Sequence, residues 1–302
     1  MKAEKKPIHP TEPSRSDRGW KKHLLSSGVP LEHEISRYLT REGLSWDADF
    51  LFSRPTTTGG ISEGSVDLSA FCFERFGKTE AAYRISLLIE CKYRSNNKSL
   101  ILLPLTEEHA GTAGGTLTVI DDMSHYHLRS TALSEFEHNF PFAYKGIEVF
   151  DGGAIEKEFR HGIEQLRHAA PVLVKSEIDF QLGSHMDDVI PVFTSKILVT
   201  NAPLKIVKPR IGLKDIEKAD LIDDIADDSD SCILYSQYGP DYPEYVRSIF
   251  ADDADARASS ASYHADQLDF SGKALSRYSD PSRLVRERAM VFGAPRSETS
   301  SL

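Results

Sequence analysis

An apolar run that ends in two charged residues constrains this chain more than any other feature of its sequence. Residues 85–89 read Ile-Ser-Leu-Leu-Ile and are followed directly by Glu90, Cys91 and Lys92. A short run rich in Leu and Ile is typical of a buried strand. Because side chains alternate along a strand, Glu90 and Lys92 share one face, and Cys91 points to the other face, into the core. A carboxylate and an ammonium group are costly to bury, so the pair predicts a functional site at a strand end.

The composition is typical of a globular protein with one large domain. The chain has 302 residues, of which 40% are hydrophobic and 27% charged, and this length suffices for a sizeable core. It contains no apolar stretch of about 18 residues and no apolar segment near Met1 of the kind found in secretory signals. Its three cysteines, an odd number at wide spacing, favour reduced thiols. We therefore expect a cytoplasmic protein that does not enter a membrane.

The charge is distributed unevenly along the chain. The net charge is −10, but the first hundred residues carry 16 Lys and Arg against 13 Asp and Glu, whereas the remainder carries 20 against 33. Contact with phosphate requires a local basic face rather than a basic protein. The part that carries Glu90 and Lys92 is thus the part suited to nucleic acid, while the acidic total argues against strong non-specific DNA binding.

The elements expected around the pair are a helix and a hairpin. Residues 1–27 are polar and rich in proline, which predicts a mobile leader. A helix is expected from Pro30 to Gly43. The elements expected next are a strand at 46–52, a loop at 55–65, a strand at 66–73, a turn at 76–80 and a returning strand at 83–93. Asp67 and Glu90 then lie on adjacent strands.

The remainder of the chain is more mixed. We treat residues 95–150, where short apolar pieces alternate with Gly-rich and acidic stretches, as an insertion. The elements expected after it are a helix at 155–169 that ends before Pro171, a strand at 192–200, a helix at 213–225, a strand at 232–238 and a helix at 242–250. Residues 252–302 are expected to be largely disordered, with a helix near 282–291. Residues 28–251 therefore predict an α/β domain with a mixed central sheet flanked by helices, ordered helix, three strands, helix, strand.

The residues at the predicted hairpin suit metal-assisted chemistry on phosphate. Hydrolysis of a phosphodiester needs a hard cation to neutralise charge and to generate hydroxide near neutral pH. Mg²⁺ commonly takes one or two carboxylates together with waters and substrate phosphate, and Asp67 and Glu90 can converge on one such ion. Lys92 can orient or deprotonate the attacking water, or stabilise the charge of the transition state. Arg94 is either a contact to a backbone phosphate or a solvated residue.

These motifs resemble those of a known nuclease superfamily. Residues 65–67, Ser-Val-Asp, followed by residues 90–92, Glu-Cys-Lys, resemble the PD-(D/E)xK signature of restriction-endonuclease-like proteins, with Val66 in place of proline. Residues 28–32 resemble the opening helix of the restriction-endonuclease-like and Mrr-like branches. Residues 161–166 are similar to the helix after the signature strand, and residues 197–202 resemble the strand that follows it. The resemblance covers roughly residues 28–94 and 155–250.

The resemblance implies a restriction-endonuclease-like core and an endonuclease that hydrolyses DNA with Mg²⁺ or Mn²⁺. It implies that the metal is bound by Asp67, Glu90, the backbone carbonyl of Cys91 and Glu32, with Glu34 as the second choice on the helix. It implies that Lys92 serves the attacking water and that Gln165 belongs to the catalytic set. The residues do not distinguish DNA from RNA and specify no oligomeric state, although many proteins of this fold act as homodimers.

The alternative is a non-catalytic module, binding nucleic acid or protein, on an inactivated nuclease fold. The acidic balance and the large insertion favour it.

Other motifs indicate less. Residues 60–64 match the Gly-x-Ser-x-Gly nucleophile elbow but precede a strand rather than a helix, which favours a plain loop. His125 and His127 could share one strand face, yet no further zinc ligands complete the set.

Overall fold

One mixed sheet organises the chain in the computed structural model, which describes residues 19–56, 60–75, 82–94, 97–105, 141–150, 152–183, 190, 192–234, 239–251 and 273–277. The helices are α1 (Gly19–Ser26), α2 (Val29–Arg41), α5 (Lys157–Gly183), α6 (Leu213–Lys218), α7 (Ile222–Ile225) and α8 (Tyr242–Ile249). The strands are β1 (Ser45–Pro55), β2 (Ile61–Arg75), β3 (Ala82–Lys92), β4 (Lys98–Pro104), β5 (Phe142–Phe150), β6 (Gly153–Ile155), β7 (Val192–Thr200), β8 (Leu204–Val207), β9 (Ala226–Ser229), β10 (Ser231–Leu234) and β11 (Lys273–Arg277).

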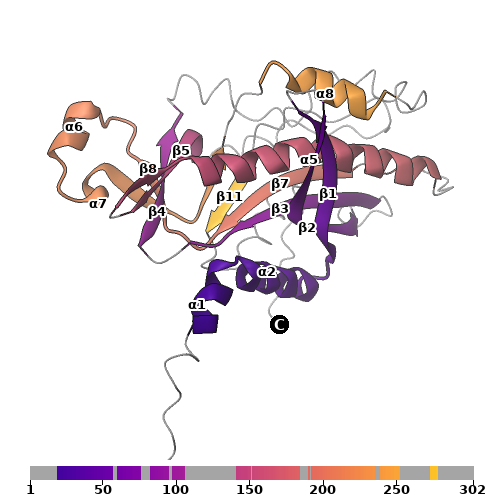
Figure 1. The fold of residues 1–302 in the computed structure, drawn as a ribbon, viewed down its shortest axis with the longest axis horizontal. Coiled ribbons are helices and arrows are strands. Elements are labelled where there is room, and N and C mark those ends of the chain that lie inside the picture. Colours follow the sequence, from indigo (N-terminus) through magenta and orange to yellow (C-terminus); the bar gives the residue numbers. More distant parts are fainter. Residues whose placement is uncertain are drawn as a thin grey trace, which may run out of the picture.

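The strands form a single sheet in the order β1-β2-β3-β7-β11-β10-β5-β4-β8-β9, with β6 beside β5. The first three strands are antiparallel neighbours, and β7 runs parallel to β3 after α5 has crossed the sheet (Figure 1). This arrangement confirms the predicted α/β class, the mixed sheet and the helical crossover. None of the helices within the described ranges is both long and apolar enough to cross a membrane.

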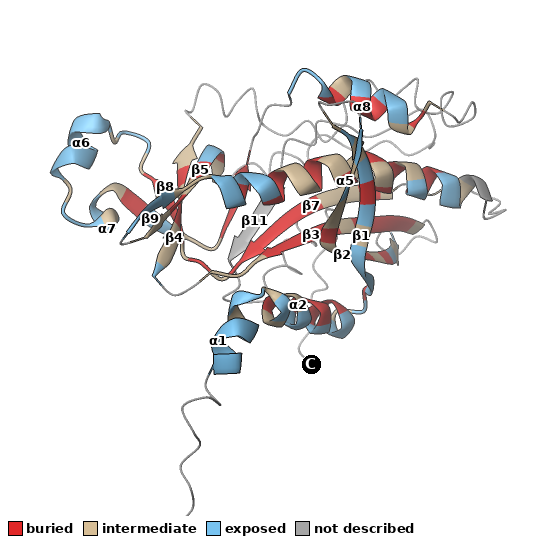
Figure 2. Ribbon diagram, in the orientation of Figure 1, coloured by how far each residue is buried: buried red, intermediate tan, exposed pale blue. Residues whose placement is uncertain are grey.

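Two core layers lie on opposite faces of the sheet, one under α5 and one under α2. Successive residues of β3 go to different layers, because Leu88 packs in the α5 layer and Ile89 in the α2 layer. The central strands β3 and β7 are accordingly buried along most of their length, whereas α6 is exposed (Figure 2). The alternation that the sequence predicted for residues 85–93 is therefore confirmed, and it directs Cys91 into the α2 layer.

Several predicted boundaries were wrong. The predicted loop at 55–65 is strand from Ile61 onward, because residues 61–65 pair with the extended end of β1. The predicted helix at 213–225 is two helices, because the Asp224 carboxylate accepts a hydrogen bond from the Leu221 backbone N–H and opens a second helix there. The predicted turn at 76–80 lies outside the described residues.

Segments predicted to be irregular also form regular structure. Within the predicted insertion, β4 and β5 pair with each other and join β8 and β10 in the sheet. Within the predicted leader, residues 19–26 form the short helix α1. Within the predicted tail, β11 pairs with β7 and β10, so backbone pairing on both sides supports a strand that its polar composition disfavours. Residues 1–18, the helix expected near 282–291, and both His125 and His127 lie outside the described ranges.

The long helix α5 continues through Pro171, where the sequence predicted that it would end. Proline lacks an N–H, so the carbonyl of Arg167, four residues earlier, loses its helical donor. The hydroxyl of Tyr242 donates a hydrogen bond to that carbonyl at 3.2 Å, and the hydroxyl of Tyr245 donates to the His168 carbonyl at 2.6 Å. Both tyrosines belong to α8, which lies along the second half of α5 (Figure 1). The hydrogen bond from Tyr242 thus replaces the one that proline removes, and that from Tyr245 adds a second contact between the helices.

This replacement predicts energetic coupling between Pro171 and Tyr242. We expect Tyr242→Phe to lower the free energy of unfolding by about 1 kcal/mol, the usual net value of one hydrogen bond. In a Pro171→Ala background the Arg167 carbonyl regains a helical N–H donor, so the cost of Tyr242→Phe should fall toward zero. Urea unfolding of the four proteins measures this coupling.

Tyr245→Phe is the matched control, because the helical donor for the His168 carbonyl is residue 172, which Pro171→Ala does not change. Its cost should be the same in both backgrounds. Equal costs of Tyr242→Phe with and without Pro171 would contradict the explanation.

Candidate functional site

The strands β2 and β3 separate beside Asp67. Their last register pair in this direction is Leu68 with Ile89, after which β2 pairs only with β1. The strand β3 continues alongside β7 until Lys92 lies opposite Thr200. Asp67 and the Glu90–Lys92 segment therefore line a fork between two diverging strands. The fork brings together, from adjacent strands, residues that lie far apart in the sequence.

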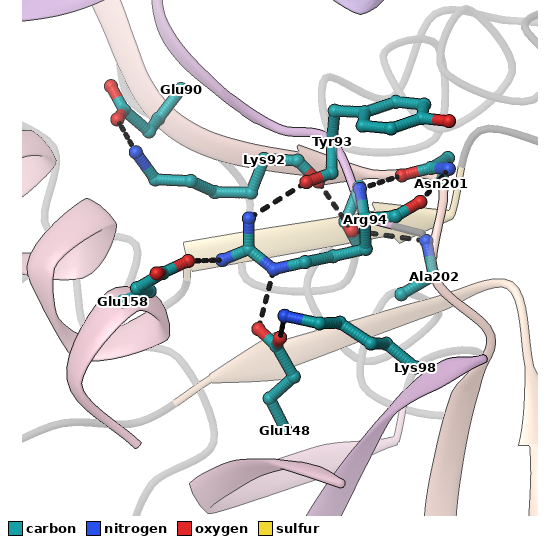
Figure 3. A network of polar contacts seen from close by, with 10 residues as sticks. Glu90, Lys92, Tyr93, Arg94, Lys98, Glu148, Glu158, Asn201 and Ala202 are labelled. Carbon is teal, nitrogen blue, oxygen red and sulfur yellow. Dashed lines mark hydrogen bonds and ion pairs between the residues drawn. The ribbon is translucent and has the colours of Figure 1, made fainter. Parts of the chain in front are cut away.

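The Glu90 carboxylate is the most buried polar group of this fork. Glu90 is 0% exposed, and its Oε1 accepts a hydrogen bond from Nζ of Lys92, whose side chain is 21% exposed (Figure 3). The second oxygen, Oε2, is buried and has no hydrogen-bond partner among the described residues. An unpaired buried carboxylate oxygen is costly, so a ligand that supplied a positive charge or a donor there would be favoured.

Asp67 is held against β3 from the other side of the fork. Its Oδ2 accepts a hydrogen bond from the Cys91 backbone N–H at 2.6 Å. Burial raises the pKa of Asp67, and this hydrogen bond and the charge of Lys92 oppose the rise. Burial also raises the pKa of Glu90 to about 7, with the Asp67 charge as the second cause. The charge of Asp67 thus disfavours the charged form of Glu90.

The helix α2 adds a third carboxylate to the same electrostatic environment. Glu32 lies in the first turn of α2. Gly28 precedes this turn with a φ of 84°, and a Cβ added to Gly28 would lie 3.3 Å from Glu32 Oε1. The pKa of Glu32 is raised first by partial burial and then by the charges of Asp67 and Asp49. Glu34, the second choice from the sequence, is exposed. The structure therefore places Glu32, rather than Glu34, beside the fork.

The helix α5 closes the fork from the opposite layer. Gln165 Nε2 donates a hydrogen bond at 2.7 Å to the carbonyl of Ser65, which belongs to the part of β2 that has left β3. A Cβ on Gly162 would lie 2.9 Å from Lys92 Cε and 3.3 Å from Glu90 Cγ. Glycine therefore lets the helix backbone rest directly on the Glu90–Lys92 pair. The sequence signal for this contact was a glycine inside a helical pattern, which usually has a packing reason.

Side chains beyond the fork fix the end of β3 (Figure 3). The Asn201 side chain accepts a hydrogen bond from the Arg94 backbone N–H at 2.5 Å and donates one to the Arg94 carbonyl at 2.7 Å. Thr200 Oγ1 donates to the Lys92 carbonyl at 2.8 Å. The Arg94 guanidinium is paired with the buried Glu148 at 2.5 Å. Arg94 is thus neither solvated nor open to phosphate, and it anchors the strand that carries Lys92.

The donor set of the fork fits a hydrated hard cation. No three His, Cys, Asp or Glu side chains in the described part of the chain form a cluster that could hold a metal ion by themselves. Mg²⁺ is commonly bound through one or two carboxylates and keeps several waters, which matches Asp67 and the unpartnered oxygen of Glu90. Burial is the main cause of the raised pKa values of Glu32, Asp67 and Glu90, with a smaller part from nearby carboxylates, and a bound cation would stabilise their charged forms.

The fold and the fork define an α/β protein with a carboxylate–lysine site between two diverging strands. Comparisons of the chain with protein-family models, with curated proteins and with solved structures found no match. The site is therefore characterised by its own residues and their geometry.

The raised pKa of Glu90 predicts how stability depends on pH. Because the folded value of about 7 lies above the ordinary 4.5, the folded protein binds this proton more tightly than the unfolded chain does. The proton on Glu90 therefore contributes its full stabilisation below pH 4.5. This contribution, which amounts to up to about 3 kcal/mol, is lost as the pH rises to about 7. Glu90→Gln removes this titration. The free energy of unfolding of the variant, relative to that of the wild type, should therefore increase as the pH rises through this range.

Urea unfolding at a series of pH values measures the difference. Glu34→Gln, which changes an exposed carboxylate of α2, should give a curve parallel to that of the wild type. If the Glu90→Gln curve is also parallel, the carboxyl group does not titrate as described.

Proposed function

We propose that this chain is a divalent-metal-dependent endonuclease that hydrolyses DNA phosphodiester bonds. One observation carries the proposal: Lys92 is bonded to the fully buried Glu90, whose second oxygen has no partner among the described residues, beside Asp67 at a fork between strands. A buried charge arrangement of this kind is costly to maintain, and it has the residue types and spacing of the PD-(D/E)xK signature.

The connectivity of the elements supports a restriction-endonuclease-like core. Apart from β4, β5 and β6, which are inserted between β3 and α5, the chain passes through α2, β1, β2, β3, α5 and β7, the order helix, three strands, helix, strand. The signature residues lie on β2 and β3, and the helices α2 and α5 pack on opposite faces of that sheet. The other strands of the sheet follow on the far side of β7, in the order β11, β10, β5, β4, β8 and β9. They therefore do not interrupt the core strands β1, β2, β3 and β7.

Each residue of the fork has a distinct part in the proposed reaction. Asp67 and Glu90 would hold Mg²⁺ or Mn²⁺, which when bound neutralises charge on the phosphate and lowers the pKa of water. The backbone carbonyl of Cys91 is a further oxygen donor at the same strand end. Lys92 Nζ donates a hydrogen bond to Glu90 Oε1, and it would orient the attacking water. Glu32 accepts hydrogen bonds from waters at the α2 side.

Exposed basic residues beside the fork support a nucleic-acid substrate. Residues at the start of α5 are exposed there, among them Lys157, Arg160 and His161. The pKa of His161 is lowered by partial burial and then by the positive charges of Lys92, Arg54 and Lys157, so these side chains lie near one another. Glu156 and Glu158 lie among them, and Arg160 pairs with Glu156 at 3.7 Å, so the phosphate contacts that we propose are individual cations.

The first test is cleavage by the purified protein with Mg²⁺ or Mn²⁺, on double-stranded DNA, single-stranded DNA and RNA. We expect cleavage of DNA, and we expect Lys92→Ala to lower its rate by about 10²-fold or more, because the water loses its positioned partner. Lys214→Ala, on the exposed helix α6, is the matched control and should leave the rate unchanged.

The same proteins distinguish the enzyme from a binding module. Calorimetric titration should show binding of Mn²⁺ that Asp67→Asn abolishes. A wild-type protein that binds nucleic acid but neither binds metal nor cleaves would be the non-catalytic module instead.

Gly162 provides a variant that should separate activity from stability. Alanine at this position would meet Lys92 Cε at 2.9 Å and Leu198 Cδ1 at 3.1 Å, so the flexible lysine side chain must move from its position. Alanine also favours a helix interior over glycine by about 1 kcal/mol. We expect Gly162→Ala to lower cleavage at least about tenfold, with little change in the free energy of unfolding.

Gly19→Ala is the control, because no atom in the described part of the chain beyond its neighbours in sequence lies within 4 Å of a Cβ at that helical position. It should leave cleavage unchanged. Loss of folding in Gly162→Ala, or full activity, would contradict the proposed contact with Lys92.

A further inference from the structure

The strand β1 places an additional acidic residue opposite Asp67. In the antiparallel register, Ala48 pairs with Leu68 and Phe50 pairs with Val66, so Asp49 lies across from Asp67. Residues directly opposite in such a pair carry neighbouring side chains. Asp49 has a φ of 54° and is the only residue other than glycine, within the described ranges, with a positive φ. The sequence reasoning did not select Asp49, since its strand was expected to be regular.

Carboxylates thus come from three adjacent strands and one helix at the same place. Asp49 on β1 lies across from Asp67 on β2, Glu90 follows the last residue of β3 that pairs with β2, and Glu32 approaches from α2. The charge of Asp49 raises the pKa of both Asp67 and Glu32, which shows that it acts on the residues of the fork. Like charges opposite each other destabilise a sheet, so a cation near Asp49 and Asp67 would stabilise this part of it.

A second observation points to a ligand at this cluster. Glu90 is fully buried, and its Oε2 has no hydrogen-bond partner within the described part of the structure. Within the described residues, the ammonium group that bonds to Glu90 is that of Lys92, and it bonds to Oε1. The acidic cluster therefore adjoins a buried oxygen without a hydrogen-bond partner among the described residues, and a cation would stabilise both.

The exposure of the four carboxylates differs, and the difference suggests different roles. Glu90 is buried, Asp67 and Glu32 are partly buried, and Asp49 is exposed. Since no three such side chains in the described ranges close around one point, Asp49 is suited to contact through water. Mg²⁺ gives up its waters reluctantly, and carboxylates that accept hydrogen bonds from those waters stabilise the bound ion.

We infer that Asp49 is a further residue of the metal site. Its carboxylate, together with that of Glu32, accepts hydrogen bonds from the waters of a hydrated divalent cation bound at Asp67 and Glu90. This inference rests on the proposed function, and it adds that β1 sets the affinity for the cation. Asp49 is a positioning residue, since it acts on the cation through water.

The test is calorimetric titration of the full chain with Mg²⁺ and with Mn²⁺ in the absence of DNA. We expect Asp49→Asn to weaken binding about 10- to 100-fold, the usual loss for a partner outside the first layer of ligands. Asparagine is chosen because it also tolerates a positive φ. The cleavage rate at saturating Mg²⁺ should be retained within a few-fold, whereas the concentration of Mg²⁺ needed for half-maximal rate should rise by the same factor as the dissociation constant.

Asp47→Asn is the matched control, because Asp47 lies on the same strand, opposite Ser69, and is also exposed. It removes the same charge two residues away and should leave binding unchanged. If Asp49→Asn binds metal like Asp47→Asn while Asp67→Asn does not bind, the role of Asp49 is refuted and the proposed function stands. If the wild type binds neither ion, both are refuted. Urea unfolding of each variant shows that a loss of binding is not a loss of folding.

Discussion

The burial of the Glu90 carboxylate is the constraint on which the surrounding structure depends. A fully buried acid whose pKa is raised to about 7 must be held by neighbours that cannot move freely. Lys92 bonds to one of its oxygens, Gly162 brings α5 onto both side chains, and Asp67 is fixed to the next backbone amide. Because the site combines four elements, its geometry is a property of the folded sheet and helices together rather than of a short motif.

The helix α5 shows how one element can serve both the site and the core. Its first turns lie over Glu90 and Lys92, and its middle inserts Gln165 into the fork. Its second half continues past Pro171, where α8 supplies hydroxyl donors, and ends near a buried pair in which Glu177 accepts hydrogen bonds from Arg84 and Ser86. Contacts at both ends prevent the helix from sliding along the sheet, so the position of Gly162 over Lys92 is determined by distant packing.

The sequence predicted the elements whose burial is periodic and whose partners are close in the chain. The α2 helix, the hairpin of β2 and β3, and β7 follow from apolar patterns, and the shared face of Glu90 and Lys92 follows from strand alternation. It could not predict that α5 continues, because the donor that compensates for the missing N–H of Pro171 is Tyr242, which is distant in the chain. The sequence did not indicate Asp49 for a similar reason. Its position opposite Asp67 depends on the register of the strands, and its positive φ has no signal in a strand pattern. Likewise β4 and β5 are strands because of partners distant in the chain.

The two hydrogen bonds between Asn201 and the backbone of Arg94 have a chemical consequence. The side-chain amide presents one acceptor and one donor, as a peptide group does, so it continues the ladder between β3 and β7 after the backbone of residue 201 has turned away. Aspartate would offer no donor, and glutamine would place the same groups one methylene too far. The chain can therefore change direction directly after β7 without loosening the strand end beside Lys92. A side chain that imitates a peptide group thus separates the path of the backbone from the rigidity of the site.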